Sequence, residues 1–100
     1  MLTPVQRHAF EGLQAFIGGR ARFWRYLVSH SHLAIRLRPP VADKDFYLVL
    51  SGCKEIAASV SWAIVQPQIV GGDAPWIALV DEGVRIVCRD AALHETYPDT

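Results

Sequence analysis

The segment 32-HLAIRLR-38 decides the fold that the sequence predicts. Its apolar residues occupy every second position, and they are Leu33, Ile35 and Leu37. Because successive side chains of a strand point to opposite faces, this spacing predicts a strand with one apolar face and one polar, basic face. Pro39 and Pro40 follow directly. Since proline cannot donate a hydrogen bond to a sheet, we expect the strand to end before them.

Runs of the same kind lie on both sides of this segment. The preceding run, 23-FWRYLV-28, also alternates and predicts a partner strand, with 29-SHSH-32 as a polar hairpin connection. Further along, 45-DFYLVLSGC-53 and 59-SVSWAIVQPQIV-70 predict a third and a fourth strand. Pro67 interrupts the fourth run, which is therefore an edge strand, a bulged strand or a strand that ends there.

The N-terminal part of the chain has a helical pattern instead. Apolar residues recur at helical spacing up to Ile17, Thr3 suits the N-cap position, and Pro4 suits the first position of a helix. Gly18 and Gly19 then stop the pattern, and one of them can take the left-handed conformation that ends many helices. We expect one helix over about residues 3–17.

These elements predict an α+β fold in which the N-terminal helix packs on an antiparallel meander sheet of about five or six strands. The run 75–90 completes the sheet as a hairpin, and residues 91–100 are expected to form a short helical turn and a loose C-terminal tail. We therefore expect a single compact domain over 1–100, with its strands within about 22–89. Its core would lie under the helix.

The composition points to a binding surface in addition to a core. Hydrophobic residues make up 51% of the chain, which includes three tryptophans, and the excess can cover a subunit interface or line a ligand pocket. We therefore expect a homo-oligomer, most simply a homodimer. No apolar run is long enough for a signal peptide or a membrane span. Two cysteines are too few for a secreted disulfide framework, so we expect a cytoplasmic protein with both cysteines as thiols.

Charge is unevenly spread along the chain. Residues 1–40 hold six arginines and one acid, residues 41–100 hold four basic and nine acidic residues, and the total is neutral. The basic and aromatic segment 20–38 could bind nucleic acid, because arginine holds phosphate and aromatic rings stack on bases. The residues for this alternative are Arg20, Arg22, Arg25, Arg36 and Arg38. The neutral total speaks against strong nonspecific binding of nucleic acid.

His30 and His32 are the residues that could suggest a metal. Two residues apart on a strand, their imidazoles would share a face, but a zinc site needs at least one further ligand, and the spacing selects none. We interpret the segment as a polar turn and predict neither a metal site nor a cofactor.

No arrangement of residues identifies an enzyme. A cysteine hydrolase would need a thiolate beside a histidine, and neither Cys53 nor Cys88 lies in such a motif, so we nominate no catalytic residue. The main hypothesis is a small non-enzymatic binding module for a protein partner or a small ligand. Its expected surface consists of Trp24, Tyr26, His30, His32, Trp62 and Trp76. The alternatives are the nucleic-acid-binding protein and a small enzyme with a pocket lined by histidine and cysteine.

Overall fold

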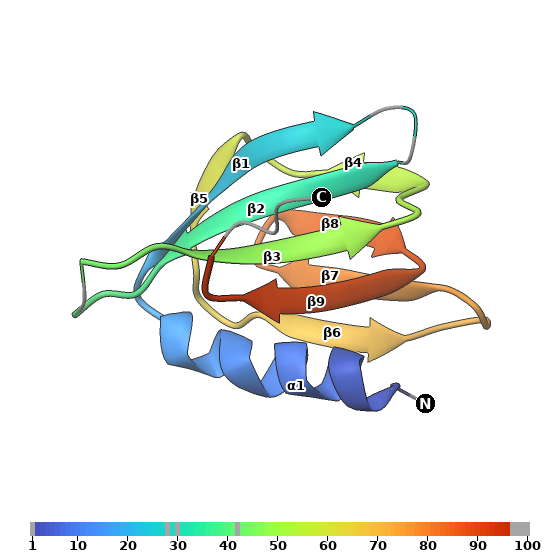
Figure 1. The fold of residues 1–100 in the computed structure, drawn as a ribbon, viewed down its shortest axis with the longest axis horizontal. Coiled ribbons are helices and arrows are strands. Elements are labelled where there is room, and N and C mark those ends of the chain that lie inside the picture. Colours follow the sequence, from blue (N-terminus) through green and yellow to red (C-terminus); the bar gives the residue numbers. More distant parts are fainter. Residues whose placement is uncertain (1, 28, 30, 42, 97–100) are drawn as a thin grey trace.

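The computed structural model describes residues 2–27, 29, 31–41 and 43–96 of the chain. Within these residues, two antiparallel sheets pack face to face, and the N-terminal helix lies along one open side of the sandwich (Figure 1). The predicted α+β class with antiparallel strands is therefore confirmed. The predicted single sheet is wrong, because the strands divide between two sheets.

The helix α1 spans Pro4–Leu13 and is followed by a 3₁₀ turn, η1, over Gln14–Phe16. Thr3 is the N-cap, as expected: its hydroxyl accepts the backbone N–H of Gln6 at 3.2 Å, and the Gln6 side chain accepts the backbone N–H of Thr3 at 2.9 Å. Gly18 has a φ of 91° and supplies the left-handed residue after the turn. Among the described residues, no helix is long and apolar enough to cross a membrane.

The first sheet has the strand order β5-β1-β2-β3-β9, and the second has the order β4-β8-β7-β6. The strands of the first sheet are β1 (Arg20–Leu27), β2 (His32–Arg38), β3 (Phe46–Ser51), β5 (Ser61–Ala63) and β9 (Asp90–His94). Those of the second are β4 (Glu55–Ala57), β6 (Gln68–Gly71), β7 (Ile77–Asp81) and β8 (Val84–Cys88).

The described residues contain nine strands, whereas the sequence predicted five or six. The run 59–70 is not one strand but two, since β5 and β6 belong to different sheets and Pro67 lies between them. The short strand β4 was not expected, because its three residues are all exposed and show no alternation. Residues 90–94 form β9 and not a helical turn, because pairing with β3 outweighs the helix propensity of Ala91 and Ala92.

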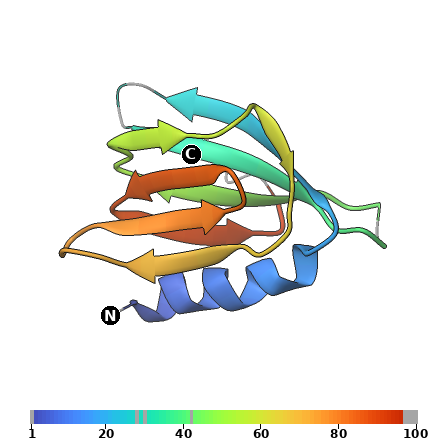
Figure 2. The same ribbon diagram turned by 180° about the vertical axis from the view of Figure 1, so that it is seen from behind.

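The core lies mainly between the two sheets, whereas the prediction placed it under the helix; Ala9 and Leu13 of the helix are buried at one side of this core. Leu33, Ile35 and Leu48 from the first sheet, and Leu79 and Ile86 from the second, are all buried in it. The helix instead contacts β9 and β6, the edge strands on one side of both sheets, and covers the gap between them (Figures 1 and 2).

Candidate functional site

The pairing of β1 with β2 gathers arginines on the outer face of the first sheet. Arg20 lies opposite Arg38, and Arg22 lies opposite Arg36. Residues directly opposite one another in an antiparallel pair share a face, and like charges in such positions destabilise a sheet. Two arginine pairs side by side therefore cost stability, which makes this face a candidate for binding rather than for packing.

These arginines line one groove. Its volume is about 390 Å³, and its lining consists of Arg20, Ala21, Arg22, Arg36, Arg38, Asp45, Val60 and Ser61. Among these lining residues, Asp45 supplies the only carboxylate. We call this surface the arginine groove. Arg25, the fifth arginine of the predicted set, is exposed opposite Ala34 and is not part of the lining.

Asp45 holds two of the arginines in place. Its carboxylate accepts a hydrogen bond from Arg38 Nε at 2.9 Å and lies 3.8 Å from Arg36 Nε. The hydrogen bond that Arg38 donates to Asp45 raises the pKa of the Arg38 guanidinium, which therefore stays charged. Asp43 lies 3.8 Å from Arg38 on the exposed side. The acids thus gather at one end of the groove.

The other end of the groove keeps its positive charge uncompensated. Arg20 Nη2 donates to the hydroxyl oxygen of Ser61 at 3.3 Å, a neutral partner. Among the described residues, no carboxylate lies within ion-pair distance of Arg20 or Arg22. This end could therefore accept an anionic group without first breaking an ion pair.

A tryptophan lies beside the groove at a bulge in β1. The register of β1 on β2 shifts between Phe23 and Arg25, so that Trp24 is the extra residue of the bulge and has no partner residue on β2. Its ring lies over the Arg36 guanidinium, 4.4 Å from ring centre to Cζ, and 6.2 Å from the Tyr47 ring. Trp24 is 46% exposed, so an aromatic surface adjoins the arginines.

The rest of the predicted binding surface is dispersed. Tyr26 is exposed further along β1, and His32 begins β2, where it pairs with Leu27. Trp62 packs edge to face on Phe23 at 5.9 Å, against the core.

Trp76 lies just before β7, next to the second sheet, with Lys54 Nζ 4.2 Å and Arg89 Cζ 5.7 Å from its ring centre. His30 lies outside the described residues. The predicted aromatic and histidine residues therefore do not form one surface, whereas four of the five predicted arginines do.

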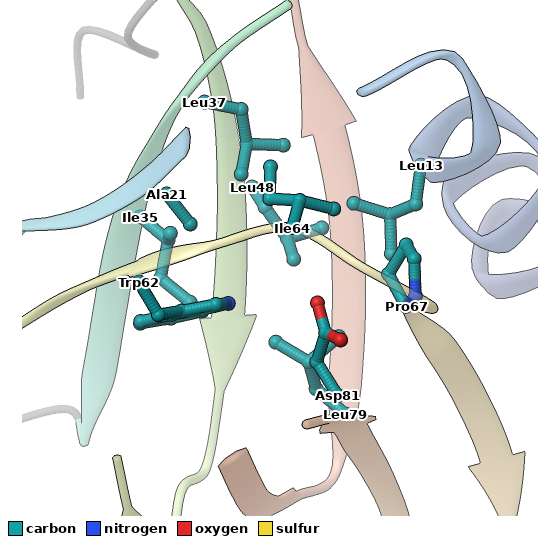
Figure 3. Close-up of a pocket in the computed structure, with 10 residues that line it drawn as sticks. All are labelled: Leu13, Ala21, Ile35, Leu37, Leu48, Trp62, Ile64, Pro67, Leu79 and Asp81. Carbon is teal, nitrogen blue, oxygen red and sulfur yellow. The ribbon is translucent and has the colours of Figure 1, made fainter. Parts of the chain in front are cut away.

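The cavity between the two sheets is too small for a substrate. A small cavity of about 10 Å³ lies between the sheets, lined mainly by apolar side chains and by Trp62 and Asp81 (Figure 3). That volume is close to the minimum for one water molecule. The ten residues that line the cavity include neither a histidine nor a cysteine, so this is not the pocket of the predicted enzyme alternative.

Asp81 is a buried carboxylate with a structural role. It is 7% exposed and accepts the backbone N–H groups of Gln66 at 2.9 Å and Glu82 at 2.7 Å, with Val65 at 3.3 Å. These bonds tie the chain after β5 to the turn between β7 and β8. Among the described residues, no three potential ligands lie close enough together to hold a metal ion.

Sequence reasoning did not select Asp45 or Tyr47, which lie at the groove and beside Trp24. Both directly flank the start of β3, and the pairing of β3 with β2 places Tyr47 opposite Arg36. A prediction that β3 lies beside β2 in this register would have found Tyr47. Comparison with known protein families, curated proteins and solved structures gave no significant match.

Proposed function

We propose that this protein is a small non-enzymatic binding module that uses the arginine groove to hold an anionic partner. The supporting observation is the placement of Arg20, Arg22, Arg36 and Arg38 around one groove in which Asp45 is the only carboxylate among the lining residues. Guanidinium groups bind carboxylates and phosphates through paired, charge-assisted hydrogen bonds, and their close spacing suits a ligand with several negative charges.

The neighbouring aromatic side chains favour single-stranded nucleic acid as the partner. Trp24 is partly exposed next to Arg36, and Tyr47 lies beside it. Unpaired bases stack on such rings while arginines hold the phosphates, and this combination binds single strands with little sequence preference. The neutral total charge does not oppose this, because the charge of this face is strongly positive while most acids lie elsewhere in the chain.

The proposal is tested by anisotropy titrations with a fluorescent single-stranded oligothymidine at several salt concentrations. Arg22→Ala and Arg36→Ala should each weaken binding and lower the slope of log affinity against log salt by about one, the change expected for one lost phosphate contact. Arg85→Ala is the matched control, because Arg85 is exposed on β8 of the second sheet. This substitution should change neither the affinity nor the salt slope.

Two competitors separate the possible anionic partners. A duplex of the same length should bind more weakly, since its bases are not free to stack. Polyglutamate represents an acidic protein segment, the closest form of the predicted protein partner. If polyglutamate binds more strongly than the oligothymidine, the partner is an acidic protein and not a nucleic acid. If wild type, Arg22→Ala and Arg36→Ala bind every probe equally, the arginine groove is not the binding site.

The self-association expected from the sequence also belongs to this proposal. β5 pairs with β1 only along Arg20–Arg22, and the N–H of Phe23 then bonds to the carbonyl of Val60 at 2.8 Å. Among the described residues, no strand pairs with 24–27 on the side away from β2. An open edge of this kind can pair with the same edge of a second copy and form a homodimer, while the face with the arginines stays free.

The proposal places the module in the cytoplasm. The two cysteines are free thiols in the structure, which suits a reducing compartment.

A further inference from the structure

Cys53 and Cys88 lie where the chain crosses between the two sheets. One crossing leads from β3 to β4, with a turn at Gly52, whose φ is 65°. Another leads from β8 to β9 through Arg89. The crossings run side by side in opposite directions and are joined by two backbone hydrogen bonds, Lys54 N–H to Val87 O and Arg89 N–H to Ser51 O, each 2.9 Å long.

This pairing places the two cysteines beside each other. Gly52 and Cys53 lie between Ser51 and Lys54 on one crossing, and together they oppose Cys88, which lies between Val87 and Arg89 on the other. Opposite residues of antiparallel segments have Cα atoms roughly 4.5–5.5 Å apart, which lies within the roughly 4.4–6.8 Å that a disulfide spans. The backbone is therefore already arranged to accept a bond between the two sulfur atoms.

The environments of the two thiols differ. Cys88 is 0% exposed and belongs to the core, whereas Cys53 is only partly buried. Hydrogen bonding with the Cys88 thiol lowers the pKa of Cys53, burial opposes this lowering, and the backbone of Leu33 lowers the pKa further. The same contact with Cys53, together with burial, raises the pKa of Cys88. The thiol of Cys53 itself donates to the carbonyl oxygen of Leu50, with 3.6 Å between Sγ and O. Cys53 is thus partly exposed and has a lowered pKa, whereas Cys88 is buried and has a raised pKa.

We propose that Cys53 and Cys88 form a reversible dithiol–disulfide pair, in which Cys53 attacks a small disulfide and Cys88 completes the internal bond. In the first step the Cys53 thiolate attacks one sulfur of the small disulfide, a mixed disulfide forms, and one small thiolate leaves and takes up a proton. In the second step the Cys88 sulfur attacks Cys53 Sγ, the mixed disulfide breaks, and the second small thiol leaves with the proton of Cys88. The two protein thiols are oxidised, and the small disulfide is reduced to two thiols.

The second step is helped by the first. Once Cys53 carries the small thiol, it no longer has a thiolate that holds the Cys88 proton, and this main cause of the raised pKa of Cys88 is gone. Burial still raises the pKa of Cys88, and so does the charge of Asp90. Attack within one folded chain then competes well with the small thiol in solution, because the reacting sulfurs are held together.

The test uses the purified full chain and glutathione disulfide as the probe, with acid quenching and intact mass measurement. We expect wild type to lose two hydrogens in mass, with Cys53–Cys88 as the linked pair after digestion without reductant. Cys88→Ala should instead accumulate the glutathione adduct on Cys53, because the resolving thiol is absent. Cys53→Ala should show no adduct while folded, because Cys88 is buried.

Two results would overturn the proposal. Wild type could keep both thiols under conditions that oxidise the unfolded chain in urea, or it could carry a stable adduct on Cys53 like Cys88→Ala. Circular dichroism shows whether Cys88→Ala remains folded. If it does not, the wild-type time course decides instead, because the mixed disulfide must appear before the internal bond and decay into it.

Discussion

The guanidinium of Arg36 lies 4.4 Å from the centre of the Trp24 ring, so that one residue joins the arginine groove to its aromatic border. This contact holds the ring against the sheet by a cation–π interaction and leaves its other parts open to solvent. Trp24 follows Arg20 and Arg22 in the alternation of β1 and is the extra residue of the bulge, so its ring lies on the outer face of the sheet beside Arg36.

Trp24→Ala should weaken the binding of single-stranded oligothymidine by about 1–3 kcal/mol, the range observed for the loss of one stacked base. The salt slope should stay unchanged, since no phosphate contact is removed. Titration by anisotropy measures both. Trp76→Ala is the control, as this ring lies between Lys54 and Arg89 away from the groove, and an equal loss in both variants would argue against stacking on Trp24.

Asp81→Ala should lower the free energy of unfolding by at least about 2 kcal/mol. The substitution leaves the partly buried backbone N–H groups of Gln66 and Glu82 without the carboxylate that they now share, and an unsatisfied buried group costs about 1–3 kcal/mol. Urea unfolding followed by tryptophan fluorescence measures the change. Glu82→Ala, at an exposed neighbour, should change the stability by no more than about 0.5 kcal/mol. Equal losses of stability in Asp81→Ala and Glu82→Ala would mean that the hydrogen bonds of Asp81 contribute little to the free energy of unfolding.

Gly19→Ala should destabilise the protein by about 3 kcal/mol, at the upper end of the usual range for single substitutions. An added Cβ would overlap the carbonyl oxygen of Arg38, which is backbone and cannot rotate away. Gly72→Ala is the matched control, because there the nearest atom to the new Cβ would be Trp76 O at 3.6 Å, an ordinary contact. Thermal unfolding of both variants gives the comparison, and two similar melting temperatures would contradict the expected overlap.

Sedimentation equilibrium at micromolar concentration should show a dimer whose amount depends on concentration. Leu27→Lys should shift it to the monomer, because a lysine on an open strand edge disfavours pairing between copies. Val70→Lys places the same charge on the second sheet and should leave the dimer intact. If the wild type remains monomeric over the whole concentration range, this result contradicts the proposed pairing of two copies through the open edge of β1.

Cys53 should react with iodoacetamide at lower pH in the folded protein than in the unfolded chain. Its pKa is lowered on folding by the hydrogen bond from the Cys88 thiol, so the reactive thiolate persists to lower pH. The rate of alkylation against pH, measured in buffer and in urea, gives both midpoints. Cys88→Ala removes the donor and should move the folded midpoint upward. Coinciding midpoints in wild type would show that Cys88 does not act on Cys53.

Local patterns predict much of this fold. The cap at Thr3, the helix stop at Gly18 and the central strands β2, β3, β7 and β8 all follow from spacing and from the conformational needs of glycine and proline. The division into two sheets does not follow, because it depends on where the chain crosses over. A strand such as β4, with three exposed residues, has no pattern of its own and exists only through its pairing with β8.

The residue types of the candidate site can be predicted from the sequence, but their arrangement in space cannot. The four arginines of the arginine groove were predicted as part of a basic segment, but their convergence depends on the register of β1 on β2, which the bulge at Trp24 alters. The contact between Cys53 and Cys88 joins residues far apart in the sequence, through crossings that no local pattern reveals. Chemistry that depends on register or on crossings is therefore the part that single-sequence reasoning misses.

The position of α1 has a consequence for the order in which the protein is built. The helix comes before every strand in the chain, yet it rests on β6 and β9, and β9 is the last strand of the fold. During synthesis, α1 therefore lacks its complete docking site until β9 has been made. Until then, the side of the two sheets that α1 covers stays exposed. The docking of α1 must follow the emergence of β9 from the ribosome, so we expect the complete fold to form late and in a concerted step. We also expect folding to be slow, because contacts between residues far apart in the sequence slow the folding of a domain.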